Sequence, residues 1–327
     1  MTRILVTGGA GVIGSALVRR LAGDGCEVRV LDDMSRGRPE RLRGVPCEVI
    51  EGDIRDPDAV TAAMHGCDSV AHLAYLNGTA VFYSEPRQVL DVAVRGMLNV
   101  LRACEETGCG DMLLMSSSEA YQVAPVVPTP ETVALTVPDV GNSRYSYGGG
   151  KIACELMAMA WARTGVLDRL IVARPHNGFG PDAGADHVIP MFCLRMNKLA
   201  AGQPEGVIEF PIQGTGLETR SFVWIGDCID QLALLLGRVP AGQHVFHVGN
   251  MDERTIASVA RDVAAAYGRV IKVVPGTLPK GAPPRRLPDT SKITALGYPG
   301  PKMPFADGLA RTVAWYRAHE RPEGIAA

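Results

Sequence analysis

The sequence predicts an α/β protein built on a doubly wound parallel sheet, and three observations favour this class. Short runs rich in Val, Ile and Leu alternate with longer helical patterns through the first 175 residues. Strands that alternate with helices form parallel sheets that are covered on both faces. A glycine-rich turn also follows the first strand pattern and opens the first helical pattern. With 327 residues, 46% of them hydrophobic, the chain is long enough for one large domain or two closely packed ones.

The elements follow in a regular order up to Pro175. The strand patterns are RILVTG, EVRVLDD, CEVIEGD, SVAHLA, DMLLMSSS and RLIVARP, and helical patterns include VIGSALVRRLAGDG, DAVTAAMHG and residues 86–107. Beyond Pro175 the alternation weakens, and helical patterns remain near residues 188–201, 227–237, 254–267 and 306–319. We therefore expect one domain over residues 1–175 and a smaller C-terminal α/β domain over 176–327. A segment near 221–250 is expected to return to the first domain.

Composition limits the classes of partner. The formal net charge is −2 and no run of Lys and Arg stands out, so we expect neither nucleic-acid nor membrane binding, and a small-molecule ligand is favoured. No apolar run approaches the roughly 20 residues that span a bilayer. The eight cysteines form no CxxC pair, which indicates reduced thiols. We expect a cytoplasmic protein without a metal site.

The turn TGGAGVIGS has the composition of a dinucleotide-binding turn. Gly8, Gly11 and Gly14 allow close backbone approach, and the following helix offers free N–H groups to a pyrophosphate. Asp32, eighteen residues after Gly14, ends the second strand, where a carboxylate binds ribose hydroxyls and repels a 2′-phosphate. This favours NAD over NADP, although Asp32 could instead be solvated and Arg36 and Arg38 could attract a phosphate. The cofactor-binding candidates from these strands and turns are Gly8, Gly11, Val12, Ile13, Gly14, Asp32, Asp53, Ile54, Leu73 and Ala74.

Asp53 follows the third strand, in EGDI, where it would lie near the adenine. A lone acid at a strand end could equally be a helix cap. Both interpretations remain open from the sequence.

Tyr147 and Lys151 stand at positions i and i+4, on one face of the helix that RYSYGGGKIACE begins. A tyrosine of ordinary pKa about 10 is a weak base near neutrality, but a nearby ammonium favours its phenolate. Taken alone, the pair could also be an ordinary surface tyrosine and lysine. Each of the three glycines between them costs about 1 kcal/mol relative to alanine in a helix interior, which calls for an explanation.

The serine cluster SSSEAYQ, residues 116–122, lies at the carboxyl end of the fifth strand, where parallel sheets bind ligands. The glycine turn, ribose acid, serine cluster and Tyr-x-x-x-Lys, in this order, resemble the extended short-chain dehydrogenase/reductase family, specifically its nucleotide-sugar epimerases and dehydratases. The resemblance covers nearly the whole chain. It implies that residues 1–175 form an NAD-binding Rossmann domain and that the C-terminal domain binds a nucleotide-diphosphate sugar.

The resemblance also implies roles for individual residues. Tyr147 would take the proton of a sugar hydroxyl, Lys151 would tune Tyr147 and hold the nicotinamide ribose, and Ser117 would bind the reacting oxygen, with Ser116 or Ser118 as alternatives. Related enzymes use a glutamate at the position of Glu119 in proton transfer, although a solvent-facing carboxylate is the simpler interpretation. Since Ser118 replaces the aspartate typical of 4,6-dehydratases, elimination of water is disfavoured.

Further family motifs supply the substrate-binding candidates. RPHNGFGP resembles the family's RxxNxYGP segment, ETRSF resembles its RDF segment, and RRLPDTSK resembles its RRxPDxxK segment. The last two segments contain Arg220 and Arg286, whose planar guanidinium groups suit phosphate oxygens. The sequence departs from the family at Tyr75, where a small residue is common, and this is expected to reshape the sugar pocket. The substrate-binding candidates are Ser118, His176, Asn177, His187, Arg220 and Arg286.

The resemblance implies an NAD-dependent nucleotide-sugar epimerase that inverts C4 or a side-chain carbon through a transient keto intermediate. A decarboxylase or 4,6-dehydratase, and a catalytically silent NAD-binding regulatory protein, are the alternatives. The glycines at 148–150 are expected to let the backbone approach the nicotinamide and the substrate. Helices near residues 86–107 and 147–163 are expected to pair across a twofold axis in a homodimer, as in relatives.

Overall fold

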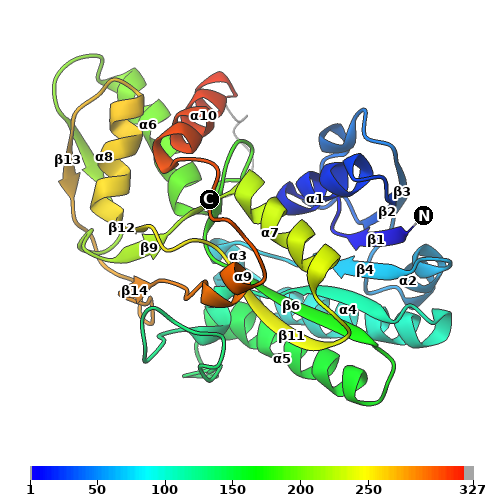
Figure 1. Cartoon of the computed structure of the whole chain (residues 1–327). Coiled ribbons are helices and arrows are strands. Elements are labelled where there is room, and N and C mark those ends of the chain that lie inside the picture. The colour runs from blue at the N-terminus through cyan, green and yellow to red at the C-terminus, as the bar shows by residue number, and fades with distance from the viewer. Residues whose placement is uncertain (1, 320–327) are drawn as a thin grey trace.

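The computed structural model describes residues 2–319 and contains a seven-stranded parallel sheet of order β11-β6-β5-β4-β1-β2-β3. Every neighbouring pair in this sheet is parallel, which confirms the predicted doubly wound α/β fold. Figure 1 shows the sheet with helices on both of its faces. Its strands are β1 (Arg3–Thr7), β2 (Glu27–Asp32), β3 (Cys47–Glu51), β4 (Ser69–His72), β5 (Asp111–Met115), β6 (Arg169–Pro175) and β11 (Gly242–Val248).

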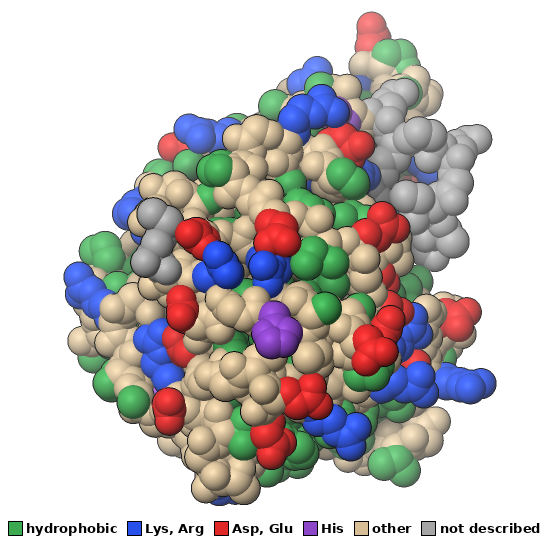
Figure 2. Space-filling model, turned by 90° about the vertical axis from the view of Figure 1, so that its right-hand side faces the viewer, with side chains coloured by type: hydrophobic (Ala, Val, Ile, Leu, Met, Phe, Trp, Pro, Cys, Tyr) green, Lys and Arg blue, Asp and Glu red, His purple; other side chains and the backbone are tan. Residues whose placement is uncertain are grey.

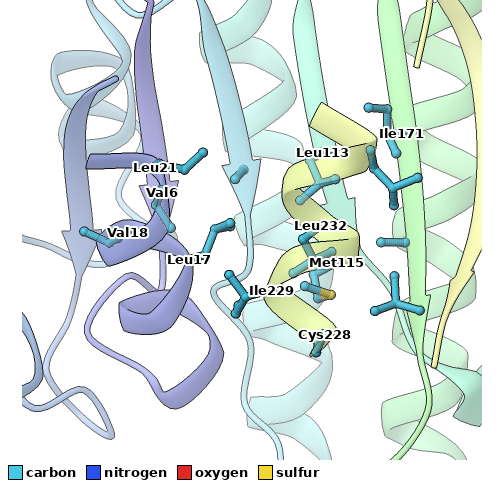
Figure 3. Close-up of a cluster of buried hydrophobic side chains, with 14 of the residues drawn as sticks. Val6, Leu17, Val18, Leu21, Leu113, Met115, Ile171, Cys228, Ile229 and Leu232 are labelled. Atoms are coloured by element: carbon cyan, nitrogen blue, oxygen red, sulfur yellow. The ribbon is translucent and has the colours of Figure 1, made fainter. Parts of the chain in front are cut away.

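Two helices, α1 (Val12–Gly23) and α7 (Ile225–Arg238), cover one face of the sheet. Figure 3 shows Leu17 and Leu21 of α1 and Leu232 of α7 pointing at the sheet, where they belong to one cluster with Val6 of β1 and Leu113 of β5. Helices α2 (Pro57–Met64), α4 (Pro86–Thr107) and α5 (Tyr145–Arg163) cover the other face. Apolar side chains buried on both faces of the central strands explain why these strands read as nearly continuous hydrophobic runs.

Local sequence sets the ends of several helices. Asp56 caps α2, because its side chain accepts from the backbone N–H groups of Asp58 and Ala59. Helix α4 begins at Pro86 and stops at Gly108, which has the left-handed conformation typical of a helix C-terminus. A short helix, α3 (Thr79–Ser84), precedes α4 and was not predicted from the sequence.

A second region, on the left in Figure 1, packs α6 (Val188–Gly202), α8 (Ile256–Ala266) and α10 (Phe305–Ala318) around Phe192, Phe210 and Tyr316. These helices confirm three of the four helical patterns predicted beyond Pro175, and α7 confirms the fourth. Short strands complete the region: β8 (Ile208–Pro211) with β13 (Ile271–Val274), β9 (Thr219–Ser221) with β12 (Glu253–Thr255) and β14 (Arg285–Arg286), and β7 (Gly178–Phe179) with β10 (Val223–Trp224).

The chain enters the second region after β6 and then returns to the sheet. The segment near 221–250 contains α7 and β11, and β11 pairs with β6 over the whole length of both strands. The short helix α9 (Ser291–Ala295) also packs against β11. Residues late in the chain are therefore needed to complete the sheet.

Acidic and basic side chains are interspersed over the face of the molecule shown in Figure 2. The pattern agrees with the small formal net charge of the chain. Within residues 2–319, no helix is both long and apolar enough to cross a membrane.

Candidate active site

The glycine-rich turn after β1 forms a tight cradle at the N-terminus of α1. Gly8 has a φ of 70°, and a Cβ on Gly8 would lie 2.7 Å from the backbone nitrogen of Ala74. A Cβ on Gly14 would lie 2.1 Å from the carbonyl oxygen of Gly8. Gly11 precedes α1 without a side-chain cap, so the first N–H groups of Val12 and Ile13 are left to a ligand. This glycine-lined helix terminus fits the pyrophosphate of a dinucleotide.

The strand end next to this turn supplies a buried carboxylate. Asp32 Oδ2 accepts from Ala10 N at 2.9 Å and Oδ1 accepts from Met34 N at 3.0 Å, and the residue is 6% exposed. Burial raises the pKa of Asp32, against these backbone hydrogen bonds. The interpretation of Asp32 as a solvated residue is therefore wrong, and its place beside the glycine turn suits a ribose. Leu73 and Ala74, after β4, donate backbone hydrogen bonds to the oxygens of Thr7 at the same edge.

Asp53 is held by a neighbour in the chain. Its carboxylate accepts from the backbone and side chain of Arg55, with an ion-pair distance of 2.6 Å. The hydrogen bond from the Arg55 side chain, against burial, lowers the pKa of Asp53. Since Asp56 caps α2, the interpretation of Asp53 as the helix cap is wrong. Ile54 is buried, and its carbonyl accepts from Asn99 Nδ2 at 3.0 Å.

The arginines after β2 are ion-paired with the loop before α6. Arg36 pairs with Asp186 at 2.8 Å, and Arg38 pairs with Asp182 at 3.2 Å. Arg41 also pairs with Asp182, at 2.7 Å, and donates to the carbonyl of Ala10 in the glycine turn. Charges that could attract a 2′-phosphate are thus already neutralised by carboxylates.

Ser117 and Tyr147 meet at the carboxyl end of β5. Ser117 precedes the 3-10 turn η2 (Ser118–Tyr121), and its Oγ accepts from Glu119 N at 3.1 Å. Tyr147 lies in the first turn of α5 and is 8% exposed. Burial raises the pKa of Tyr147 to about 12, and a hydrogen bond with Ser117 acts in the opposite direction. Of the three serines, Ser117 is thus the one that contacts the phenol.

The Lys151 ammonium lies deeper in the fold than the sequence suggested. Its Nζ donates to the carbonyl of Met115 at 2.7 Å and is 5.8 Å from the ring centroid of Tyr147 but 3.6 Å from that of Tyr75. Burial lowers the pKa of Lys151 to about 8. The Tyr147 ring lies farther from this ammonium than the Tyr75 ring does, and the influence of Lys151 on the Tyr147 phenol stays a prediction. Met115 and Tyr75 contact the ammonium directly, and the hydrogen bond with Ser117 acts to lower the phenol pKa.

Glu119, beside Ser117 in η2, forms an ion pair with Arg286 at 2.5 Å. Burial would raise the pKa of Glu119, but the Arg286 charge and hydrogen bond, with Arg144 and Arg220 nearby, hold it below its usual range. The interpretation of Glu119 as a solvent-facing acid is therefore wrong. Among the described residues, Arg286 Nε, Arg286 Nη2 and Arg144 Nε have no hydrogen-bond partner, so the cluster has donors left for an anion. The sequence offered no motif for Arg144.

Arg220 lies next to Arg286 because β14 pairs with β9. It donates to the carbonyls of Thr219 and Pro283, and burial followed by the charge of Arg286 lowers the pKa of Arg220 to about 10. Three arginines thus surround Glu119 next to the Ser117–Tyr147 pair, and Arg220 also interacts with Glu218.

The remaining substrate candidates lie in different surroundings. Asn177 has a positive φ of 38° and donates to the carbonyl of Ser221 at 2.8 Å, and Ser118 is buried in η2. His176 is buried edge-to-face on His247, with ring centroids 4.9 Å apart. Burial, with the charge of His247, lowers the pKa of His176 well below its ordinary value. His187 is exposed at the start of α6, with Nε2 3.5 Å from Asn77 Nδ2.

A buried polar network, absent from the sequence interpretation, supports the strand end that carries Ser117. Glu155 of α5 accepts from the hydroxyl of Ser116 and from Arg174 Nη2, the latter at 2.5 Å. Arg174 also donates to Tyr121 Oη at 2.5 Å, and this hydroxyl lies 2.7 Å from His247 Nε2. The network joins α5, β6, η2 and β11 behind the predicted catalytic residues.

The three glycines of α5 meet protein atoms where the sequence suggested a cofactor. A Cβ on Gly148 would lie 2.2 Å from Gln122 Nε2, and one on Gly150 would lie 2.3 Å from Tyr75 Oη. A Cβ on Gly149 would be in ordinary contact, 3.5 Å from Val137 Cγ2. The close approaches at Gly148 and Gly150 are therefore explained by neighbouring loops of the protein itself.

Comparisons with known proteins agree with this geometry. Residues 4–249 match the model of the NAD-dependent epimerase/dehydratase family. The chain is 32% identical to the dTDP-glucose 4,6-dehydratase of Streptomyces niveus, over 96% of this chain and 93% of that protein. It is 31% identical to UDP-glucuronic acid decarboxylase 1 of Arabidopsis thaliana, over 96% and 70%. The Thermus thermophilus UDP-glucose 4-epimerase, solved in complex with NAD, superposes with a TM-score of 0.83 at 27% identity, covering 97% of this chain and 99% of that one.

Proposed function

Because the chain belongs to the NAD-dependent epimerase/dehydratase family, we propose that it is a nucleotide-sugar epimerase that inverts a hydroxyl-bearing carbon, C4 or a side-chain carbon, through a transient keto intermediate. Its cofactor is NAD, and the turn formed by Gly8, Gly11 and Gly14, with Asp32, fits this dinucleotide. NAD held by these residues would supply the reversible hydride transfer that inverting a sugar carbon requires. The redox state of the protein is then unchanged after each cycle.

The protein side chains would move the proton. Tyr147 would take the proton of the reacting hydroxyl and return it, and Ser117 would donate a hydrogen bond to the same oxygen. With a pKa of about 12, Tyr147 by itself is mostly protonated at neutrality, so a positive charge brought near it must favour the phenolate. The positively charged ring of NAD is one such charge.

The ionisation state of Glu119 is the observation that favours epimerisation over elimination of water. Loss of water requires an acid that protonates the departing hydroxyl, and the residue after Ser117 is Ser118. The neighbouring carboxylate, Glu119, is ion-paired with Arg286, which favours its ionised form. A site without a carboxylic acid supports a reaction that needs only the reversible transfer of one proton and one hydride.

The arginine cluster favours a second candidate, a nucleotide-sugar decarboxylase. Arg144, Arg220 and Arg286 outnumber Glu119, and the free donors of Arg144 and Arg286 could bind a sugar carboxylate as well as a diphosphate. Oxidation by the same Tyr147 would create the keto group that makes loss of carbon dioxide feasible. This candidate shares every residue of the first and differs in the substrate.

Product analysis separates these candidates. The purified protein is incubated with a panel of UDP- and dTDP-linked hexoses and uronic acids, and products are followed by mass spectrometry and NMR. An epimer of unchanged mass supports the proposal, while loss of carbon dioxide or of water identifies the decarboxylase or dehydratase. The Tyr147→Phe variant should lose the activity. If no panel member is converted and none reduces bound NAD, the proposal is wrong and a silent NAD-binding protein is favoured.

We also propose that the protein forms a homodimer through α4 and α5. The two helices pack side by side on one face of the sheet, and their outer surface carries exposed Leu90, Val94 and Leu156. Leu156 is the most exposed of the three, at 67%. A second copy would cover these side chains.

A further inference from the structure

Tyr75 follows β4 and contacts both ends of the Tyr147–Lys151 pair. Its ring packs edge-on against that of Tyr147, with centroids 5.1 Å apart, and its hydroxyl donates to the backbone oxygen of Tyr147 at 3.2 Å. Lys151 Nζ lies 3.6 Å from the centroid of the Tyr75 ring. One side chain from outside α5 therefore touches both predicted catalytic residues.

We propose that Tyr75 is a positioning residue whose ring holds and stabilises the Lys151 ammonium and whose hydroxyl fixes the first turn of α5. This inference rests on the proposed function, in which Tyr147 takes and returns the proton of the reacting hydroxyl, and on the expected role of Lys151 in tuning Tyr147 and holding the ribose. Tyr75 is not itself expected to transfer a proton, because burial raises its pKa well above the ordinary value.

The Lys151 ammonium needs such support because it is buried. The residue is 4% exposed, and the structure gives Nζ one hydrogen bond, to Met115. Burial lowers the pKa of Lys151 to about 8, and the neighbouring Cys154 and Glu155 on its own helix act in the opposite direction. His72, at the end of β4, faces the Lys151 ammonium. Burial and the Lys151 charge lower the pKa of His72 to about 3, so His72 is neutral and does not stabilise the ammonium. An aromatic face at 3.6 Å is a favourable environment for a desolvated cation.

Gly150 provides the space that Tyr75 occupies. A Cβ on Gly150 would lie 2.3 Å from Tyr75 Oη, 3.0 Å from Ala93 Cβ and 3.6 Å from Tyr75 Cζ. The phenol hydroxyl therefore fits only above a glycine, which explains one of the three residues that make the start of α5 an unfavourable helix sequence. Tyr75 and Gly150 thus form a complementary pair.

The first test measures the protonation of Lys151 directly. The chain has six lysines, so the ¹³Cε signals of lysine-labelled protein can be assigned with a Lys151→Arg variant and titrated in the absence of sugar; the six are Lys151, Lys198, Lys272, Lys280, Lys292 and Lys302. Tyr75→Leu should lower the pKa of Lys151 by about one unit, because the cation loses its aromatic face. Tyr75→Phe keeps the ring and should leave it nearly unchanged.

Phe82→Leu is the matched control. Phe82 stacks on the Tyr147 ring, with centroids 4.6 Å apart, and belongs to the same buried cluster. Its truncation removes a similar ring and should leave the Lys151 titration unchanged. The proposal is overturned if Tyr75→Leu leaves the Lys151 pKa in place, or if Phe82→Leu shifts it equally.

The second test needs only the melting temperature, and it tests the pairing of the Tyr75 hydroxyl with Gly150 even if Tyr75→Leu does not fold. Gly150→Ala should lower the melting temperature clearly in the native background and much less in Tyr75→Phe, where the nearest Tyr75 atom to the new Cβ would be Cζ. Equal effects in both backgrounds would overturn the pairing. Neither test uses a sugar substrate, so a wrong proposed function would leave both results interpretable.

Discussion

Arg174→Met should destabilise the protein strongly, because it leaves a buried carboxylate without its partner. The side chains of Arg174 and Glu155 are 6% and 7% exposed, and two hydrogen bonds, of 3.0 and 2.5 Å, join them. Methionine would fill much of the space of the arginine stem without replacing the charge. Among residues 2–319, the hydroxyl of Ser116 would then be the one remaining hydrogen-bond partner of the Glu155 carboxylate.

The expected cost follows from the burial of the pair. Removal of one partner from a buried ion pair costs about 3–5 kcal/mol, whereas replacement of both by apolar residues is often nearly neutral. Arg174→Met should therefore lower the free energy of unfolding by about 3–5 kcal/mol and the melting temperature by roughly 5–10 °C. The double variant Arg174→Met/Glu155→Leu should recover most of this loss. Because Ser116 precedes Ser117, the single variant should also lose sugar oxidation.

Urea unfolding followed by circular dichroism measures these differences. Lys272→Met is the matched control, since the ion pair of Lys272 with Glu209 is about 70% exposed on both sides and should contribute less than about 1 kcal/mol. The reasoning is refuted if Arg174→Met costs no more than Lys272→Met. It is also refuted if Arg174→Met/Glu155→Leu has a free energy of unfolding about 3–5 kcal/mol below that of Arg174→Met, as expected for two independent losses.

Three further outcomes are expected. The ion pair with Arg286 lowers the pKa of Glu119, so it stabilises the folded protein at pH values above the ordinary carboxyl pKa. Arg286→Gln should therefore reduce the free energy of unfolding, measured with urea, by more at pH 7 than at pH 4. An equal reduction at both pH values would contradict this. Asp182→Asn should release Arg38 and Arg41 and raise the affinity for NADP several-fold while changing that for NAD little, as measured by calorimetry, and unchanged NADP affinity would show that these arginines do not reach the ribose. Leu156→Arg should convert the proposed dimer to a monomer in light scattering, and a wild-type chain that is already monomeric would remove the proposal.

The parts of the fold that depend on local pattern were predictable from the sequence. The alternation of strands and helices gave the parallel sheet, and the bounds of α4 matched the helical pattern at 86–107 because Pro86 and Gly108 mark its ends. The family resemblance assigned Ser117 and Tyr147 to the same reacting oxygen, and in the structure the two side chains are hydrogen-bonded at the carboxyl end of β5.

Contacts between distant positions were not predictable. Glu119 and Arg286 are 167 positions apart, and Arg41 and Asp182 are 141 apart, so nothing in either local sequence indicates the partner. The protein neighbours of two glycines of α5 were not predictable for the same reason: Gln122, near Gly148, and Tyr75, near Gly150, come from other segments. Asp53 was hard to interpret even from its own neighbourhood, because several polar residues follow one another there. Arg55 forms an ion pair with Asp53, and Asp56 is the residue that caps α2.

Because β11 comes late in the chain, the sheet stays incomplete during much of synthesis and in any fragment truncated near residue 175. Strand β6 is complete at Pro175, but its outer edge pairs with β11, which is not synthesised until Val248. A nascent or truncated chain that ends near residue 175 would expose seven residues of unpaired strand, Arg169–Pro175, and would lack the apolar face of α7 that covers the sheet. Such a fragment should aggregate even though it contains every residue of the dinucleotide cradle.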